Sequence, residues 1–166
     1  MRENISWQDS RAFLEQLPRG AFLTVSHGGR LNTMTIGWGS IGHIWQRPVI
    51  MVMVRYSRHT HQLIKDAPDF TVSLPLDGNL KKELGQAGTK SGRDMDKFAE
   101  LSLAPQPALK TVSPVIKGGG LHYECRVIYK QEMDENALDA EIRDQYYSDG
   151  DYHVLYYGEI VACYRD

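Results

Sequence analysis

Apolar residues occur in short runs along the chain, and glycine, proline and polar residues separate these runs. Alternating apolar and polar positions predict a half-buried strand, and a continuous apolar run of about four to eight residues is consistent with a fully buried one. Apolar positions three to four residues apart predict a helix instead. We therefore expect strands over residues 20–26, 32–42, 48–54, 70–74, 121–129 and 153–164, and helices over 6–17, 60–67, 80–84 and 95–101, with weak helical periodicity over 136–147.

These elements favour a mainly β fold with antiparallel strands. A hairpin turn is expected at His27–Arg30, and several other connections are too short for the helical crossovers that parallel strands need. Helices are inserted between strands without strict alternation, which is typical of an antiparallel barrel with α-helical additions. The 166 residues contain no repeat, linker or low-complexity tract, so a single domain over residues 1–166 is expected.

Composition and charge argue against several classes of function. The formal net charge is −2 and no run of Lys or Arg is present, so binding to nucleic acid or to an anionic membrane is not expected. No apolar stretch approaches the ~18 residues of a membrane helix, and the first residues lack the apolar segment of a secretory signal. A cytoplasmic protein without a membrane partner is predicted. Cys125 and Cys163 form no CxxC motif, and we expect them to be buried thiols.

The segment 32–42 is rich in small residues for a strand. It contains three glycines together with the hydroxyl groups of Thr33, Thr35 and Ser40. Glycine within a strand marks a bulge or a position where another group approaches the backbone closely. Two interpretations follow. The segment forms a corner of a barrel, or it binds a planar cofactor whose polar edge forms hydrogen bonds with hydroxyl and backbone N–H groups.

Three further clusters of small, hydroxyl-bearing and charged residues follow in the order 55–60, 91–97 and 152–160. Taken with segment 32–42, they resemble the flavin reductase-like FMN-binding family, in its flavoredoxin-like branch, over residues 20–164. The resemblance implies a split β-barrel that forms a homodimer, with FMN held near the subunit interface. Tyr156 and Tyr157 are the aromatic residues that we expect to be left exposed for such an interface.

The phosphate of FMN is a dianion, so it needs cationic side chains, hydroxyl groups and N–H donors. Arg55, Ser57, Arg58 and Thr60 supply these groups at the end of a strand and the start of a helix. The resemblance favours the phosphate-binding role for this segment. The alternative for the two arginines is that they are solvated charges at a strand end.

The pyrimidine edge of a flavin becomes more negative on reduction, and a nearby cation stabilises that charge. Arg93 and Lys97 are the candidate cations, with Ser91 and Gly92 beside them, while Asp94 is expected to cap a helix that starts at Met95. The resemblance assigns the earlier segment to the lining of the flavin ring. Core packing is the alternative for Trp38. The expected residues of that segment are Asn32, Thr33, Met34, Thr35, Trp38, Gly39, Ser40 and Ile41.

The chain departs from the family pattern at four positions, which are Tyr56, His59, His61 and Ala87. Relatives often carry Pro-Ser-Arg-Tyr-Thr-Tyr where this chain has 56–61, with His59 and His61 in place of the aromatic residues, and a cysteine at the position of Ala87. The Ser, Arg and Thr of the motif are retained, so FMN binding is still expected, while substrate specificity and any thiol chemistry are left open. His59 and His61 have no further ligand at suitable spacing, so no metal site is predicted.

These features predict an FMN-binding oxidoreductase that passes electrons from a reduced donor, NAD(P)H, to an acceptor. One alternative is a non-enzymatic flavin carrier or electron-transfer protein, which needs only the flavin site. A second is an enzyme that oxidises a pyridoxamine phosphate, but the second basic cluster that it needs is not found in the sequence. No catalytic side chain is assigned because hydride transfer requires no side-chain acid or base. The sequence does not distinguish NADH from NADPH.

Overall fold

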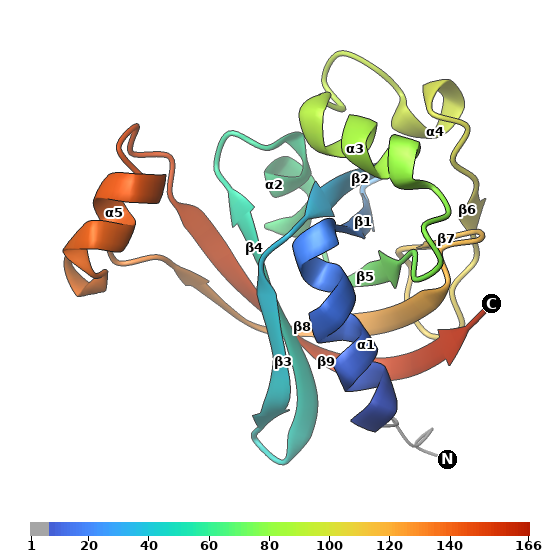
Figure 1. Ribbon diagram of the computed structural model, residues 1–166, viewed down its shortest axis with the longest axis horizontal. Coiled ribbons are helices and arrows are strands. Elements are labelled where there is room, and N and C mark those ends of the chain that lie inside the picture. Colours follow the sequence, from blue (N-terminus) through green and yellow to red (C-terminus); the bar gives the residue numbers. More distant parts are fainter. Residues whose placement is uncertain (1–6) are drawn as a thin grey trace.

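The computed structural model describes residues 7–166, which form a seven-stranded antiparallel sheet with helices packed around it (Figure 1). The sheet curls around a core without closing, because β2 and β3 are edge strands, and this confirms the expected fold class. A small second sheet pairs β6 (Pro105–Gln106) with β7 (Val115–Ile116). The main sheet has the order β2-β1-β5-β8-β9-β4-β3, with β1 Ala21–His27, β2 Arg30–Ile36, β3 Gly39–Ile44, β4 Arg47–Arg55, β5 Asp69–Leu74, β8 Leu121–Glu132 and β9 His153–Arg165.

The expected hairpin turn joins β1 to β2. Gly28 and Gly29 both have positive φ (59° and 75°), as a two-residue turn between right-twisted strands requires. The expected single strand over 32–42 is wrong, because the chain breaks at Gly37–Trp38. Strand β2 pairs with β1 up to Ile36, whereas β3 starts at Gly39 and pairs with β4. A Cβ atom at Gly39 would lie 2.8 Å from the carbonyl oxygen of Met51, so only glycine fits there.

The helices are shorter or differently placed than the sequence predicted. Ser6, one expected cap of the first helix, lies outside the described residues, and Asp9 accepts a hydrogen bond from Arg165. The helix expected from Met95 is a single turn that starts at Lys97. Its cap is Asp96, whose carboxylate accepts from the N–H groups of Phe98 and Ala99, so the capping role expected of Asp94 is wrong. The helices are α1 Trp7–Gln16, η1 Leu17–Arg19, α2 His59–Ile64, α3 Lys81–Thr89, α4 Lys97–Glu100, η2 Glu135–Ala137 and α5 Ala140–Tyr146.

The main core lies between the curled sheet and helices α1 and α2. Phe13 of α1 packs edge-on against the ring of Tyr123 in β8, with ring centroids 5.7 Å apart. A second cluster covers the outside of β1, where Phe22 meets Leu84 and Ala87 of α3. This second cluster fixes α3 against the sheet and so positions the loop between α3 and α4, which carries the Ser-Gly-Arg segment.

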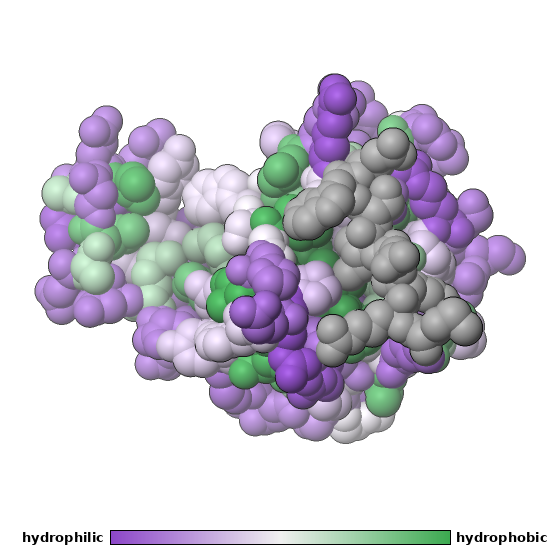
Figure 2. All heavy atoms as spheres, turned by 90° about the horizontal axis from the view of Figure 1, so that it is seen from below, coloured by the Kyte–Doolittle hydropathy of each residue, from purple (hydrophilic) through white to green (hydrophobic). Residues whose placement is uncertain are grey.

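Strands β8 and β9 continue past the body of the molecule as a ribbon, with α5 at its far end (Figure 1). Helix α5 buries none of its residues, and Ile142 and Tyr146 are 45% and 40% exposed. Apolar side chains are visible on this projection in the space-filling view (Figure 2). The expectation that Tyr156 is exposed is wrong, because its ring faces the core and is 1% exposed, whereas Tyr157 on the other face of β9 is partly exposed.

Both cysteines are thiols, with Cys125 buried and Cys163 partly buried. Burial raises the pKa of Cys125 well above its ordinary value, so this thiol stays protonated. None of the helices within residues 7–166 is long and apolar enough to span a membrane. The cytoplasmic location stays a prediction.

Candidate functional site

A cleft forms where the start of α2, the middle of β2, the loop between α3 and α4, and the segment before β9 meet. It contains two adjoining pockets of about 380 and 190 Å³. Met34, Arg55 and Arg58 line both pockets and so connect them. We call the larger the polar pocket and the smaller the ring pocket. The polar pocket is also lined by Asn32, Ser57, His59, Thr60, Thr89, Lys90, Ser91, Gly92, Arg93, Lys97, Tyr146, Ser148, Asp149 and Asp151.

Direct side-chain contacts join the sequence clusters around the polar pocket. The amide Nδ2 of Asn32 donates to Oγ1 of Thr60 at 2.8 Å, which ties β2 to α2. Gly92 packs against the same asparagine, since a Cβ atom there would lie 2.3 Å from Oδ1 of Asn32 and 2.8 Å from Cδ2 of His59. Three motifs that are far apart in the sequence therefore share one contact region, and the glycine is required for it.

Cations line the polar pocket, and most are held by backbone carbonyl groups. Nη1 of Arg58 donates to the carbonyl of Gly88 at 3.0 Å, and Nη1 of Arg93 donates to that of Ser57 at 2.9 Å. Nζ of Lys97 donates to the carbonyls of Thr33 (2.9 Å) and Ala87 (2.8 Å). Neutral oxygens position these charges without cancelling them, so the pocket attracts anions.

Lys97 is buried, with only 3% of its surface exposed. Burial, together with the neighbouring charge of Arg58, lowers its pKa from 10.5 to about 8. Burial and the charge of Arg58 therefore destabilise the ammonium form of Lys97, and an anion bound in the pocket would stabilise it.

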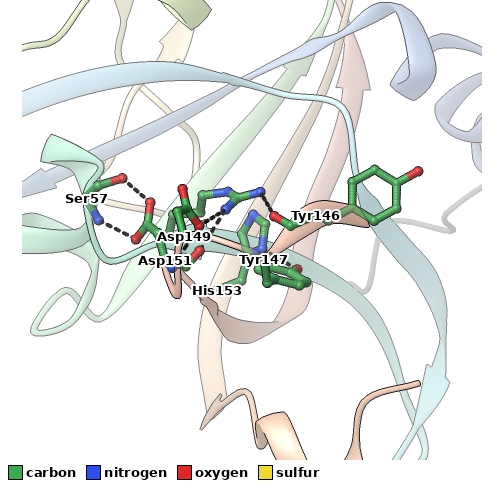
Figure 3. A network of polar contacts seen from close by, with 7 residues as sticks. Ser57, Tyr146, Tyr147, Asp149, Asp151 and His153 are labelled. Carbon is green, nitrogen blue, oxygen red and sulfur yellow. Dashed lines mark hydrogen bonds and ion pairs between the residues drawn. The ribbon is translucent and has the colours of Figure 1, made fainter. Parts of the chain in front are cut away.

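Arg55 and Ser57 are bound by the segment that precedes β9 (Figure 3). Arg55 donates to the carbonyls of Asp151 (2.8 Å) and Tyr146 (3.0 Å), and its guanidinium lies 5.0 Å from the ring centroid of Tyr147. The carboxylate of Asp151 accepts from Ser57 through both its N–H (3.2 Å) and its hydroxyl (2.5 Å). An anion from the chain itself thus occupies donors that the sequence predicted for a phosphate.

The ring pocket is less polar than its neighbour. Besides the three shared residues it is lined by Thr35, Ile36, Gly37, Trp38, Met53 and His153. Trp38 is 43% exposed, and its ring lies 5.0 Å from that of Tyr146 and 5.6 Å from that of His153. The alternative that Trp38 packs in the core is therefore wrong. Because the chain turns at Gly37–Trp38, this indole lies at the mouth of the ring pocket.

His153 is held in the neutral form beside the ring pocket. Its Nδ1 lies 2.6 Å from the hydroxyl oxygen of Tyr147. Burial, followed by the charge of Arg55, lowers the pKa of His153 from 6.5 to about 4. At neutral pH this pocket is therefore lined by the neutral imidazole of His153, by apolar side chains and by the charged groups of Arg55 and Arg58.

His59 and His61 follow Arg58 in helix α2. The Nδ1 atom of each is buried without a hydrogen-bond partner, and burial lowers the pKa of both. For His59, the charges of Arg93, Arg30 and Lys97 lower the pKa further. His59 thus lines the polar pocket as an uncharged side chain with cations around it.

The structure brings together twelve of the sixteen residues that the sequence predicted: Asn32, Met34, Thr35, Trp38, Arg55, Ser57, Arg58, Thr60, Ser91, Gly92, Arg93 and Lys97 line one or both pockets. Thr33 does not, because its hydroxyl faces β1, where it meets Thr24 (3.0 Å) and the carbonyl of Leu23 (3.2 Å). Gly39, Ser40 and Ile41 lie beyond the chain break, on β3, and line neither pocket.

Sequence reasoning missed Met53, Tyr146 and Asp151. Met53 alternates with core residues along β4, and no local signal marks the face on which it lies. Asp151 directly precedes the cluster 152–160 that carries part of the family resemblance, but nothing in the sequence indicates its contact with Ser57. Arg93 and Lys97 line the polar pocket and not the ring pocket, and their expected position by the edge of a flavin ring stays a prediction.

The residues of this cleft fit a flavin mononucleotide. The polar pocket offers cations, hydroxyl groups and the backbone near Gly92, as a phosphate and a polyol chain require. The carboxylate of Asp151, bound to two donors of Ser57, shows that an oxyanion is accommodated there. The ring pocket offers a thioether, an indole and small residues, as a flat aromatic ring requires.

Comparisons with known proteins agree with this geometry. The family model for the flavin reductase like domain matches residues 14–166, so the chain belongs to that family. An uncharacterised protein of Archaeoglobus fulgidus is 33% identical over 121 residues, which cover 73% of this chain and 67% of that protein. The flavoredoxin of Methanosarcina acetivorans (25% identity, TM-score 0.68) is matched over 89% of this chain and 68% of its own. An FMN-binding protein of Thermus thermophilus (25% identity, TM-score 0.68) is matched over 88% and 69%.

Proposed function

We propose that this protein is an FMN-binding oxidoreductase that passes electrons from NAD(P)H to an acceptor. The observation that carries the proposal is that the cationic polar pocket adjoins the ring pocket, and that Met34, Arg55 and Arg58 line both. A ligand with an anionic end and a flat ring would fill the two connected pockets. The family of the chain and the similarity to an FMN-binding protein also support the proposal.

The polar pocket is the phosphate end of the proposed site. Arg58 and Arg93 supply charged donors, Thr60 and Ser91 supply hydroxyl groups, and Lys97 supplies a buried positive charge. Since the cationic residues are concentrated in one region of the pocket, we infer a preference for the mononucleotide over the dinucleotide FAD.

The ring pocket is the reactive end. FMN, when bound, accepts a hydride and passes the electrons on, and this chemistry belongs to the cofactor. Met34 and Trp38 are among the residues that would hold the ring, and neutral His153 would contribute no charge beside it. Trp38 is partly exposed, so a donor or an acceptor could reach the ring pocket from the side on which this indole lies.

The direct test is steady-state oxidation of NADH and of NADPH by the flavin-loaded protein. Turnover that requires the loaded protein, and exceeds that of the same amount of free FMN, supports a reductase. Absence of turnover with both donors, despite bound FMN, identifies the second candidate function, an electron carrier. The similarity to the flavoredoxin of Methanosarcina acetivorans favours that second candidate.

We also propose that the protein is a homodimer with the flavin near the subunit interface. The support is helix α5, which buries no residue in one chain although an isolated seven-residue helix is unstable in water. Ile142 on this helix is an exposed apolar residue. Trp45 and Tyr129, whose ring centroids lie 6.0 Å apart, are exposed as well. A second subunit would cover these side chains. Light scattering that gives the mass of one chain for the flavin-loaded protein would contradict this proposal.

A further inference from the structure

Asp151 binds the two donors of Ser57 that face the polar pocket. Its Oδ1 accepts from the N–H and its Oδ2 accepts from the hydroxyl, so both carboxylate oxygens are engaged by one residue (Figure 3). A phosphate would accept from the same two donors, because phosphate and carboxylate are both oxyanions that accept hydrogen bonds from N–H and O–H groups. Carboxylate and phosphate therefore exclude one another at Ser57.

The surroundings of Asp151 are built for an anion. Arg55, Arg58, Lys90, Arg93 and Lys97 line this pocket, and the carboxylates that line it are those of Asp149 and Asp151. The two carboxylates differ in position. Asp149 is 68% exposed and lies 3.9 Å from Nη1 of Arg55, without a hydrogen bond to Ser57.

The backbone of Asp151 is held independently of its side chain. Its carbonyl oxygen accepts from Arg55 at 2.8 Å, and its N–H donates to Oδ1 of Asp149 at 3.0 Å. Rotation of the Asp151 side chain alone therefore frees Ser57, and the segment that carries Tyr146 and His153 keeps its place.

We propose that Asp151 is a specificity-determining residue that competes with the phosphate of the flavin for Ser57. The inference rests on the proposed flavin site. Riboflavin, which has the same ring and no phosphate, does not need Ser57 and leaves the Asp151 contact intact. FMN must displace the carboxylate before its phosphate binds. The contact thus weakens FMN binding selectively and sets the ratio of FMN to riboflavin affinity.

The test compares the dissociation constants of FMN and riboflavin for the full-length protein and two variants with the same change in charge. Asp151→Asn removes the competing anion with little change in shape. Asp149→Asn removes a negative charge from the same turn and keeps the oxygen that accepts from the N–H of residue 151. Thermal unfolding of each variant verifies its fold, and Asp151→Ser provides a second variant that is too short to reach Ser57.

We expect Asp151→Asn and Asp151→Ser to bind FMN roughly tenfold or more tightly than the parent, the scale of a charged hydrogen bond, with riboflavin affinity unchanged. Asp149→Asn should shift FMN affinity by much less. Equal effects of the two asparagine variants would overturn the proposal, because the cause would be general electrostatics. Weaker FMN binding by both Asp151 variants would also overturn it, since Asp151 would then support the site. A parent protein that binds no flavin would instead contradict the proposed function.

Discussion

The ammonium group of Lys97 lies 2.9 Å from the carbonyl oxygen of Thr33, and this contact anchors the loop motif of residues 91–97 to strand β2. The second acceptor, the carbonyl of Ala87 at 2.8 Å, belongs to helix α3. One buried cation thus holds three elements together at the floor of the polar pocket. The arrangement gives the proposed phosphate site its charge and also makes that charge sensitive to pH.

The affinity for FMN should fall as the pH rises through about 8. The pKa of Lys97 is lowered to about 8, so the ammonium form is present below that pH and is lost above it. The phosphate, whose second pKa is about 6, keeps a constant charge over that range. Dissociation constants measured from pH 7 to pH 9.5 should show weaker binding at high pH for the parent. Lys97→Met should bind FMN weakly at every pH, and a pH profile in this variant that matches the parent would contradict the role given to Lys97.

Arg58→Ala should weaken FMN binding by about 1.5–3 kcal/mol, the range of a charged hydrogen bond. Arg58 lines both pockets, and its charge is not cancelled by the neutral carbonyl of Gly88 that it contacts. Arg126→Ala is the matched control, because Arg126 pairs with Glu159 outside the cleft. Isothermal titration of both variants measures the difference. Equal affinities for the two variants would show that the phosphate lies elsewhere.

Gly92→Ala should reduce both flavin binding and stability. A methyl group at this position would lie 2.3 Å from Oδ1 of Asn32, which would break the packing between the loop and β2 at a cost of about 1–3 kcal/mol. Gly85→Ala in helix α3 is the control. Its added methyl group would have nothing within 4 Å apart from its chain neighbours and the backbone of its own helix, and alanine favours a helix. Chemical denaturation should show Gly85→Ala to be as stable as the parent or more so. A Gly92→Ala protein with parental stability and affinity would refute the close approach at this glycine.

The reduction potential should depend on Arg55 more than on Arg93. Arg55 lines the ring pocket as well as the polar pocket, whereas Arg93 lines the polar pocket alone. Loss of a cation near the ring destabilises the reduced anionic flavin, and about 30 mV corresponds to 1.4 kcal/mol for two electrons. Arg55→Met should therefore lower the two-electron potential by tens of millivolts, and Arg93→Met should leave it near the parental value. Reductive titration against a reference dye measures both, and the reverse order would place the ring in the polar pocket.

The sequence predicted most of this fold because its signals are local. Paired glycines at 28 and 29 specify a tight hairpin, and alternating residues mark β8 and β9. The break between β2 and β3 was missed because Gly37 and Gly39 fit equally well inside a strand and at its end. Exposure of Tyr156 was predicted wrongly, since a run of two tyrosines on a strand does not show which one faces the core.

Site residues could be predicted where the residue type itself indicates the role. They could not be predicted where the role depends on how distant segments pack together. Arginine and hydroxyl residues around α2 are typical of an anion site, and they do line the polar pocket. Lys97 was predicted as a cation of the site, but its burial, with 3% of its surface exposed, depends on how α3 and α4 pack and has no signal in the sequence. The contact between Ser57 and Asp151 joins residues 94 positions apart, and no pattern along the chain connects them.

Equilibrium titration of the purified protein with FMN and with FAD, followed by flavin fluorescence, tests the central claim most directly. The account predicts that FMN binds at one molecule per chain and more tightly than FAD, because the cationic polar pocket adjoins the ring pocket in one cleft. FAD affinity equal to or greater than that of FMN, or no binding of either flavin, would contradict it.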